Sequence, residues 1–476
     1  MNTLKVKNPR SGIADYEITP ASAGEVAAIA TELKKAQGEW AANITLRLDS
    51  LSRWADAMEA ARQELADAVI NDTGRRSVSF LEVDGMVNRI RYWLERAPAL
   101  LAPPGEAHSE TAANVTYRLL GVPVGLVGVI SPWNFPLTLS LVDAIPALFA
   151  GCAVLIKPSE VTPRFAPVLQ RTIDAVPELS KVFQIAVGDG ATGVALVDNV
   201  DMVCFTGSVA TGRRVAVRAA ENFIPACLEL GGKDPSIVLE DADLDAAADA
   251  VLRSTVSSNG QACMSVERVF AHRSVFDAFV EKLRVRAEAL EFNGPDIHRG
   301  QLPPFIFDQQ AGKVAEQVQD ALEKGAKLHC GGVPEQLECG GYWQRPTLLT
   351  NVSKDMLLMQ EETFGPVIPV IPFDTDEEAL ALANDSEFGL SGSVFGEETH
   401  AMAIASRLEV GAVGINDASM TGLIHDVEKQ SFKYSGMGAS RMGNEGLLRF
   451  LKTRAIMVQR DKPASMTLFD ESLMPR

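Results

Sequence analysis

The chain of 476 residues carries 44 Lys and Arg against 62 Asp and Glu, which gives a formal net charge of −18. This balance argues against a nucleic-acid or anionic-membrane partner, because phosphate binding needs clustered Lys and Arg. Hydrophobic residues make up 46% and charged residues 22%, an ordinary globular composition that excludes a disordered chain. At about 150 residues per domain, the length fits two large or three smaller domains.

Residues 21–101 repeat apolar side chains at the helical spacing i, i+3, i+4 and i+7, and Gly74 offers a stop within them. The β-prone run ANVTYRLL follows at 113–120. Between residues 126 and 212, three strand-like runs (LVGVIS, AVLIKPS and MVCFTG) alternate with helical ones. This order predicts a parallel, doubly wound sheet. A second α/β region extends from about residue 235 to about residue 430, and the tail contains one more strand-like run, AIMVQR.

No segment has the pattern of a membrane span or an export signal. The longest apolar stretches, such as residues 144–156, are interrupted by Pro146 and Gly151 and fall short of the roughly 20 residues that a spanning helix needs. Residues 1–12 lack the apolar centre of a signal peptide. We therefore expect a cytoplasmic protein with no membrane and no nucleic-acid partner.

The six cysteines are scattered, and none forms a C-x-x-C pair, so a disulfide framework is a poor interpretation. Cys330 and Cys339 lie in glycine-rich surroundings, with His329 as the only other nearby candidate ligand. We interpret them as loop cysteines and expect no metal site.

Cys263 is the candidate nucleophile. It lies in SSNGQACMSVERVF, where small and polar residues precede it and a strand-like run follows. A thiolate is the strongest nucleophile among the ordinary side chains, provided that its pKa is lowered or a base assists. The histidines offer no obvious Cys–His pair, which leaves the base to a carboxylate. Glu229 in LELGGKDP fits that need, although a lone Glu in such a string is more often a surface residue.

Three turn segments carry polar groups suited to a phosphate, a ribose or an oxyanion. FTGSVATG (205–212) follows a strand and opens a helix, so its N–H groups can face a phosphate. In KPSE (157–160), Lys157 and Glu160 can bond to ribose hydroxyls, and the Glu160 charge disfavours a 2′-phosphate. SPWNFP (131–136) holds the amide of Asn134 between two prolines, as an oxyanion donor requires. Each segment alone is also explained as an ordinary turn.

Together these segments resemble the motifs of the NAD(P)-dependent aldehyde dehydrogenase superfamily, from about residue 20 to about residue 455. The motifs stand in the family's order: SPWNFP, KPSE, FTGS-x-x-x-G, LELGGKDP, GQACMS and EETFGPV. Their separations fit as well, with 23 residues from Asn134 to Lys157 and 34 from Glu229 to Cys263. Six ordered motifs are far more specific than any one of them.

The resemblance implies a reaction. Cys263 would attack an aldehyde, and the Asn134 amide and the backbone N–H of Cys263 would hold the resulting oxyanion. Hydride would pass to the nicotinamide, and water activated by Glu229 would hydrolyse the thioester to a carboxylic acid. The cofactor would be NAD, with NADP possible. The family's cofactor contacts match Trp133, Lys157, Ser159, Glu160, Gly207, Ser208, Glu362 and Phe364.

The resemblance also implies the fold class: α/β, with a Rossmann-type parallel-sheet cofactor domain, an α/β catalytic domain and a β-arm for oligomerisation. We assign residues 1–104 and 124–231 to the NAD-binding domain and residues 232–432 to the catalytic domain. Residues 105–123 and 447–476 are assigned to the oligomerisation arm and C-terminal strand. The expected partners are a small-molecule aldehyde and further copies of the chain, in a homodimer or homotetramer.

The substrate stays open. Most relatives read PFGG-x-K-x-SG-x-GRE-x-G near the C-terminus, where this chain has KQSFKYSGMGASRMGNEG (429–446), so the meaning of the unusual 411–446 loop is open too. Asp143 replaces a Lys that is common in relatives. Two interpretations stay open: the change alters proton handling, or it reflects lineage drift alone. Apolar residues after Asn134, such as Phe135 and Leu139, favour an aliphatic or aromatic aldehyde.

Three alternatives remain. A coenzyme-A-acylating enzyme usually lacks the Glu that matches Glu229, and a semialdehyde-specific member would need an anchoring cation, which no Arg next to Cys263 supplies. An Arg distant in sequence could still serve. A non-catalytic descendant would have no need to keep Cys263, Glu229 and Asn134.

Overall fold

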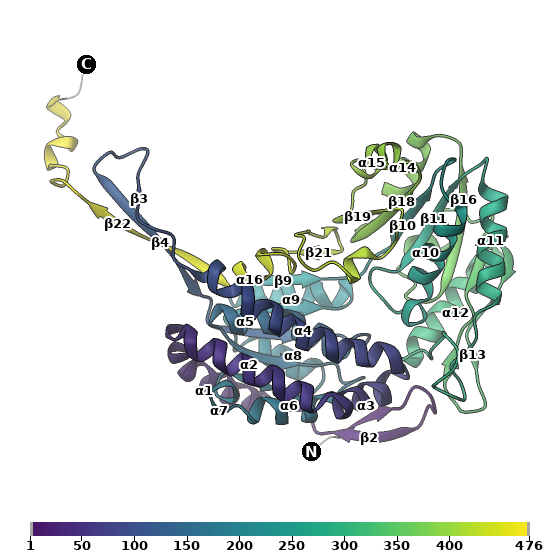
Figure 1. Cartoon of the computed structure of the whole chain (residues 1–476), viewed down its shortest axis with the longest axis horizontal. Coiled ribbons are helices and arrows are strands. Elements are labelled where there is room, and N and C mark those ends of the chain that lie inside the picture. Colours follow the sequence, from purple (N-terminus) through teal and green to yellow (C-terminus); the bar gives the residue numbers. More distant parts are fainter. Residues whose placement is uncertain (1–2, 474–476) are drawn as a thin grey trace.

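A computed structural model describes residues 3–473 of the chain, so the outermost residues of two assigned ranges, 1–2 and 474–476, lie outside the described part. Figure 1 shows two α/β units side by side and a slender arm that extends away from them and carries the C-terminal end. Within the described residues, no helix is long and apolar enough to cross a membrane.

The N-terminal part is a hairpin followed by helices. Strands β1 (Leu4–Lys7) and β2 (Ala14–Ile18) pair antiparallel. The helical pattern of residues 21–101 is confirmed as four helices: α1 (Ala23–Ala42), α2 (Ile44–Ala60), α3 (Arg62–Thr73) and α4 (Arg76–Leu101). Ser22 and Glu25 form a capping box at the start of α1. Gly74, at φ +67°, ends α3 in the left-handed conformation, as predicted.

The first sheet has the strand order β21-β9-β8-β5-β6-β7. Its five parallel strands are β5 (Leu126–Ile130), β6 (Ala153–Lys157), β7 (Phe183–Ile185), β8 (Met202–Thr206) and β9 (Ala226–Glu229). Helices connect these strands: α5 (Pro136–Ala150), α6 (Phe165–Asp174), α7 (Pro177–Ser180), α8 (Gly190–Val197) and α9 (Val209–Glu221). The chain builds outward from β5 in one direction and then from β8 in the other, so the predicted doubly wound sheet is confirmed. Ligands bind such sheets outside the carboxyl ends of the strands, where the order reverses.

The second sheet has the order β12-β15-β16-β11-β10-β18-β19. Its parallel strands are β10 (Asp234–Val238), β11 (Val266–His272), β15 (Thr347–Thr350), β16 (Val367–Phe373), β18 (Ser391–Phe395) and β19 (Ala412–Ile415), and β12 (Lys327–Cys330) joins antiparallel. Its helices are α10 (Leu244–Val256), α11 (Phe276–Glu288), α12 (Asp308–Glu323), α13 (Leu357–Gln360), α14 (Asp376–Asn384) and α15 (Glu398–Ala405). Shorter elements are η1 (Ser257–Gly260), β13 (Glu335–Gln336), β14 (Tyr342–Trp343), β17 (Phe388–Gly389), η2 (Met420–Gly422) and β20 (Phe432–Lys433).

The chain then returns to the first unit and forms the arm. β21 (Gly436–Met437) pairs with β9, and α16 (Glu445–Leu448) packs on α5. The arm consists of β3 (Ala107–His108), β4 (Val115–Pro123) and β22 (Leu451–Gln459) in the order β22-β4-β3, followed by η3 (Met466–Phe469) and η4 (Glu471–Leu473). The strands expected at 113–120 and at AIMVQR are therefore partners of each other.

Candidate active site

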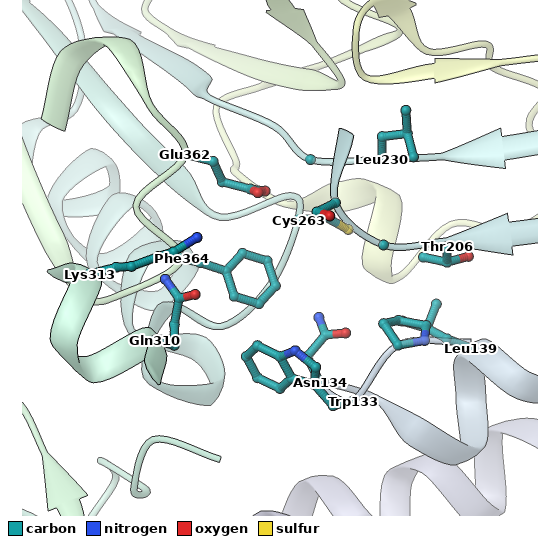
Figure 2. A pocket seen from close by; sticks show the side chains of 14 residues that line it. Trp133, Asn134, Leu139, Thr206, Leu230, Cys263, Gln310, Lys313, Glu362 and Phe364 are labelled. Atoms are coloured by element: carbon teal, nitrogen blue, oxygen red, sulfur yellow. The ribbon is translucent and has the colours of Figure 1, made fainter. Parts of the chain in front are cut away.

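A cavity of about 150 Å³ opens at the carboxyl end of β8, between the two units (Figure 2). The loop after β5, the β8–α9 turn, the residues after β9, the Cys263 loop, α12 and the segment after α13 all contribute to its wall. The lining residues are Pro132, Trp133, Asn134, Leu139, Thr206, Gly207, Ser208, Leu230, Gly231, Cys263, Gln310, Lys313, Glu362 and Phe364. Many residues predicted from separate motifs thus meet in one cavity.

A strained loop carries Cys263. Between α10 and β11 the chain passes through Ser258, Asn259 and Gly260 at φ +54°, +57° and +74°. A Cβ on Gly260 would lie 2.2 Å from the carbonyl carbon of Gly365, so only glycine fits there. The loop is shaped for a close approach to the segment that follows α13.

The surroundings of Cys263 favour the protonated thiol. Burial, followed by the charge of Glu362, raises the pKa of Cys263 to about 12, and the charge of Lys429 opposes this rise. A cysteine nucleophile needs either a lowered thiol pKa or an assisting base. Because burial raises the pKa of Cys263, a base must take the proton when the sulfur attacks. Glu229 is among the charges that act on this thiol.

Asn134 lies between β5 and α5, with its side chain directed into the cavity beside Cys263 (Figure 2). Its Nδ2 donates to the carbonyl oxygen of Gln261 at 3.0 Å, which ties the amide to the loop that carries the nucleophile. An amide nitrogen has two N–H groups, so the second one remains available for an oxygen in the cavity.

Glu229 ends β9 and is half-buried, and Leu230 and Gly231 directly after it line the cavity. Glu229 itself is outside the cavity wall. Its Oε2 accepts a hydrogen bond of 3.2 Å from the Ser431 hydroxyl, and its main chain pairs with Gly436 of β21. The segment that replaces the family's PFGG turn therefore contacts the candidate base.

Glu362 and Phe364 reach the cavity from the opposite side. The Oε1 of Glu362 accepts the N–H of Gly232 at 3.0 Å, and burial raises the pKa of Glu362 to about 8, with the charge of Glu267 adding to the rise. Phe364, at φ +53°, meets the Trp133 ring edge-on at 5.4 Å between centroids. Both aromatic rings line the cavity.

Lys157 ends β6, Ser159 and Glu160 follow it, and none of the three lines this cavity. The Nζ of Lys157 lies 3.0 Å from Glu160 Oε2, and the half-exposed carboxylate keeps an oxygen for a ligand. Ser208 caps α9 by accepting the N–H of Thr211 at 3.4 Å. These residues lie at or just after the carboxyl ends of β6 and β8, the two strands on either side of β5.

Sequence reasoning missed Gln310 and Lys313, which reach the cavity from α12. Their spacing of three places them on one helix face, but this pattern alone is that of an ordinary solvated face. It also missed Lys429, whose backbone N–H is held by the Ser440 hydroxyl at 3.1 Å.

The structure explains Asp143. Its buried carboxylate pairs with Arg441, at 2.7 Å, and with Arg449. Burial alone would raise the pKa of Asp143, but the two guanidinium charges lower it overall. Arg441 also donates to Thr206 Oγ1 at 2.7 Å, and Thr206 lines the cavity. Asp143 and Arg441 of the 429–446 segment, both in regions where this chain departs from the family, thus form an ion pair with each other.

The fold and the cavity define a two-unit α/β enzyme in which a buried thiol faces a side-chain amide at the edge of a Rossmann-type sheet. The chain belongs to the aldehyde dehydrogenase family, whose model matches residues 1–456. It is an oxidoreductase that acts on aldehydes.

Relatives and solved structures agree with this assignment. The protein PutA of Anabaena variabilis has a solved structure with a TM-score of 0.95 and 45% identity, covering 98% of this chain and 99% of its own. Betaine aldehyde dehydrogenase of Staphylococcus aureus, solved in complex with NAD+, has a TM-score of 0.90 and 29% identity over 99% of this chain and 94% of its own. A relative from Mycolicibacterium smegmatis, named for succinate semialdehyde and NADP(+), is 34% identical over 95% of this chain and 89% of its own length.

Proposed function

We propose that this chain oxidises an aldehyde to the carboxylic acid with NAD as hydride acceptor, through a thioester on Cys263. The observation that carries the proposal is the placement of the Cys263 sulfur beside the Asn134 amide in one cavity. A nucleophile next to a preorganised donor is the arrangement that acyl chemistry needs, because charge develops on the carbonyl oxygen when the sulfur adds.

The residues present fit a dinucleotide. Lys157 and Glu160 offer a cation and a carboxylate to ribose hydroxyls, and Ser208 opens a helix whose N–H groups suit a phosphate. A Cβ on Gly231 would lie 2.5 Å from the Glu362 carboxylate, so a larger residue at position 231 would collide with Glu362 in the cavity wall. When bound, NAD accepts the hydride that leaves the aldehyde carbon. The carboxylate of Glu160 favours NAD over NADP, as it would repel a 2′-phosphate.

The protein's own groups carry the remaining steps. Cys263 sulfur bonds to the carbonyl carbon and loses its proton to a base, while the Asn134 amide and the Cys263 N–H stabilise the oxyanion. After the hydride has left, Glu229 takes a proton from water, which attacks the thioester and releases the acid and the thiol. The sum is aldehyde, NAD+ and water giving acid, NADH and a proton. The hydrogen bond from Ser431 orients the Glu229 carboxylate. The presence of Glu229 argues against transfer to coenzyme A, because family members that acylate coenzyme A usually lack this Glu.

The test is Cys263→Ala. We expect NADH formation with any aldehyde to be lost, because no other group in the cavity can form the thioester, whereas the affinity for NAD in a fluorescence titration stays unchanged. Cys339→Ala, at an exposed cysteine, is the matched control and should keep full activity. Turnover of Cys263→Ala comparable to that of the control would overturn the proposal.

A semialdehyde is the second candidate substrate. The observation that favours it is Lys429, a cation from the loop beside Glu229 whose charge acts on the Cys263 thiol. The Mycolicibacterium smegmatis relative is named for such a substrate. In this version the ammonium of Lys429 pairs with the far carboxylate of the aldehyde, as no Arg stands next to Cys263 in the sequence.

The remaining expectations complete the proposal. The arm joins copies of the chain into a homodimer or homotetramer, since β22 leaves one edge unpaired among the described residues. In the proposed division at residues 104, 124, 232 and 432, the five parallel strands of the first sheet belong to the cofactor unit and the second sheet to the catalytic unit, while β21 lies outside the assigned ranges. The site of action is the cytoplasm.

A further inference from the structure

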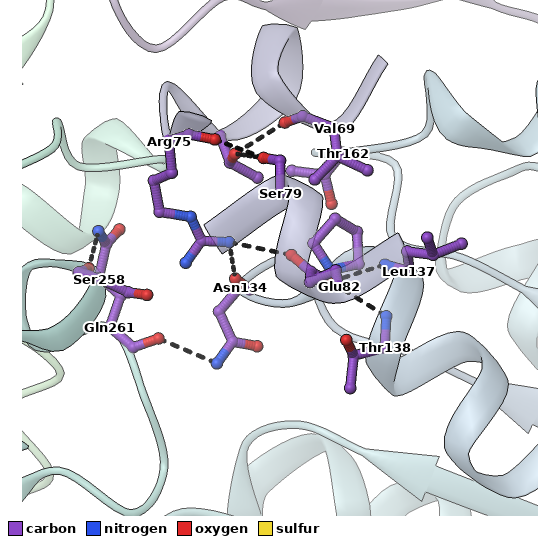
Figure 3. Close-up of polar contacts among 12 residues, drawn as sticks. Val69, Arg75, Ser79, Glu82, Asn134, Leu137, Thr138, Thr162, Ser258 and Gln261 are labelled. Carbon is purple, nitrogen blue, oxygen red and sulfur yellow. Dashed lines mark hydrogen bonds and ion pairs between the residues drawn. The ribbon is translucent and has the colours of Figure 1, made fainter. Parts of the chain in front are cut away.

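A buried ion pair, Arg75 and Glu82, lies next to the main chain of Asn134 (Figure 3). Arg75 directly precedes α4, and Glu82 follows two turns later on the same helix. Their side chains are each 2% exposed, with Arg75 Nη2 lying 3.5 Å from Glu82 Oε1. Burial lowers the pKa of Arg75 to about 10, so it stays charged at neutral pH. Neither residue lines the cavity.

Both members of the pair bond to the main chain around Asn134. The same Nη2 of Arg75 donates to the carbonyl oxygen of Asn134. Glu82 Oε2 accepts the N–H groups of Leu137 and Thr138, at 3.2 and 3.0 Å. The backbone is therefore held by α4 both at Asn134 and three to four residues later.

The second contact replaces a missing helix cap. Helix α5 begins at Pro136, which has no N–H, and its N-cap residue Phe135 makes no side-chain cap bond. The free N–H groups of the first turn would otherwise be buried without acceptors. Glu82 supplies the acceptor from a neighbouring helix, and its negative charge suits the positive end of the helix dipole.

The neighbours of Asn134 are tied down as well. Thr162 Oγ1 donates to the carbonyl oxygen of Trp133 at 3.2 Å, and the Arg75 guanidinium carbon lies 4.7 Å from the centroid of the Phe135 ring. The Asn134 side chain faces the Cys263 loop through its bond to Gln261. Burial raises the pKa of Glu82, and the Arg75 charge opposes this rise, so two buried ionisable groups hold one short stretch of main chain.

We propose that Arg75 and Glu82 are positioning residues for the oxyanion donor, which hold the main chain so that the Asn134 amide faces a carbonyl bound to Cys263. This inference rests on the proposed function. Neither residue touches substrate or cofactor; both act through Asn134. Preorganised donors lose much of their effect when displaced by about 1 Å, so loosening this anchor should slow formation of the thioester.

The test is a double-mutant cycle on the pre-steady-state NADH burst, which reports the steps up to the thioester. Asn134→Ala is expected to slow the burst by about 10²- to 10³-fold. Arg75→Met should slow it by about 10- to 100-fold in the wild-type background, and by less than about 3-fold when Asn134 is already Ala. Arg75→Lys, which keeps one donor for the Asn134 carbonyl, should recover part of the rate.

Alkylation of Cys263 by iodoacetamide, followed by peptide mass spectrometry, is the control for a merely structural effect. This reaction forms no oxyanion, so Arg75→Met should leave its rate unchanged. Equal slowing by Arg75→Met in both backgrounds, or parallel loss of burst and alkylation, would overturn the inference. If Arg75→Met fails to fold, the same cycle with Glu82→Gln, which keeps volume and an acceptor oxygen, decides. An unchanged burst in Asn134→Ala alone would instead refute the oxyanion role in the proposed function.

Discussion

Lys429 and Asp143 show how single residues set the charges around this cavity. Asp143 brings Arg441 to Thr206 at the cavity wall, and Lys429 stands in the segment that contacts Glu229. Burial raises the pKa of the Cys263 thiol, and the charge of Lys429 lowers it. We expect Lys429 to be the cation that an anionic substrate meets.

Lys429→Met is expected to lower kcat/KM for succinic semialdehyde relative to butanal by about 10- to 100-fold, because a charge-assisted hydrogen bond to a carboxylate contributes about 1.5–3 kcal/mol. The two substrates have the same chain length and differ in the carboxylate, and their ratio is measured by NADH formation. Lys327→Met, at an exposed position of β12, is the control. An unchanged ratio would leave Lys429 without a role in substrate choice and would favour a neutral aldehyde.

The segment after α13, which contributes Glu362 and Phe364 to the cavity wall, is held by a second buried ion pair, formed by Lys233 and Glu267. Lys233 Nζ donates to Glu267 Oε2 at 2.7 Å and to Thr363 Oγ1 at 2.8 Å. Glu267 also accepts the backbone N–H groups of Thr363 and Phe364, both at 2.8 Å. The left-handed conformation of Phe364 is thus maintained from β10 and β11, not by its own segment.

Glu267→Gln is expected to lower the thermal unfolding midpoint by about 5 °C, since removing one partner of a buried pair leaves the Lys233 charge uncompensated at a cost of about 3–5 kcal/mol. The KM for NAD should rise, because Glu362 and Phe364 lose their support. Lys233→Met combined with Glu267→Gln should be less destabilised than the sum of the single variants, as no unpaired charge remains. Additive shifts in scanning calorimetry would show that the two side chains are not coupled.

The whole molecule consists of two sheet-containing units that meet at the cavity, and of an arm that projects from them (Figure 1). The cavity forms only where the carboxyl edge of the first sheet meets the Cys263 loop and α12 of the second unit. The arm contributes nothing to that cavity. The three strands of the arm project from the two units and leave Met457 and other apolar side chains of β22 exposed, so the arm is expected to gain stability by packing against a second copy.

Met457→Lys is expected to shift the chain toward smaller assemblies in size-exclusion chromatography with light scattering. Met457 is 72% exposed on β22, and a charge there would disfavour burial against a partner. Val285→Lys, at an exposed apolar position of α11, should leave the mass unchanged. Equal masses for both variants and the parent chain at all concentrations would exclude the arm as the contact between copies of the chain.

The sequence by itself determined the parts of this protein that depend on neighbouring residues. Apolar periodicity defined the helices of residues 21–101, and the alternation of strand-like and helical runs defined the doubly wound sheet. Motifs after β5 and β8 placed Asn134 and Ser208 at one edge of the first sheet, because the carboxyl ends of parallel strands meet at the same edge. Cys263 precedes β11 of the second sheet, and only the family resemblance linked it to them.

Only the tertiary structure decided which distant side chains pair. Arg75 reaches the Asn134 carbonyl across 59 residues, and Asp143 meets Arg441 across 298. Such partners follow from the packing of α4, α5 and the returning C-terminal segment, and no local pattern encodes them. The same holds for the charge around Cys263: burial, a property of the folded chain, raises the pKa of that thiol, whereas its local sequence only marks it as a nucleophile.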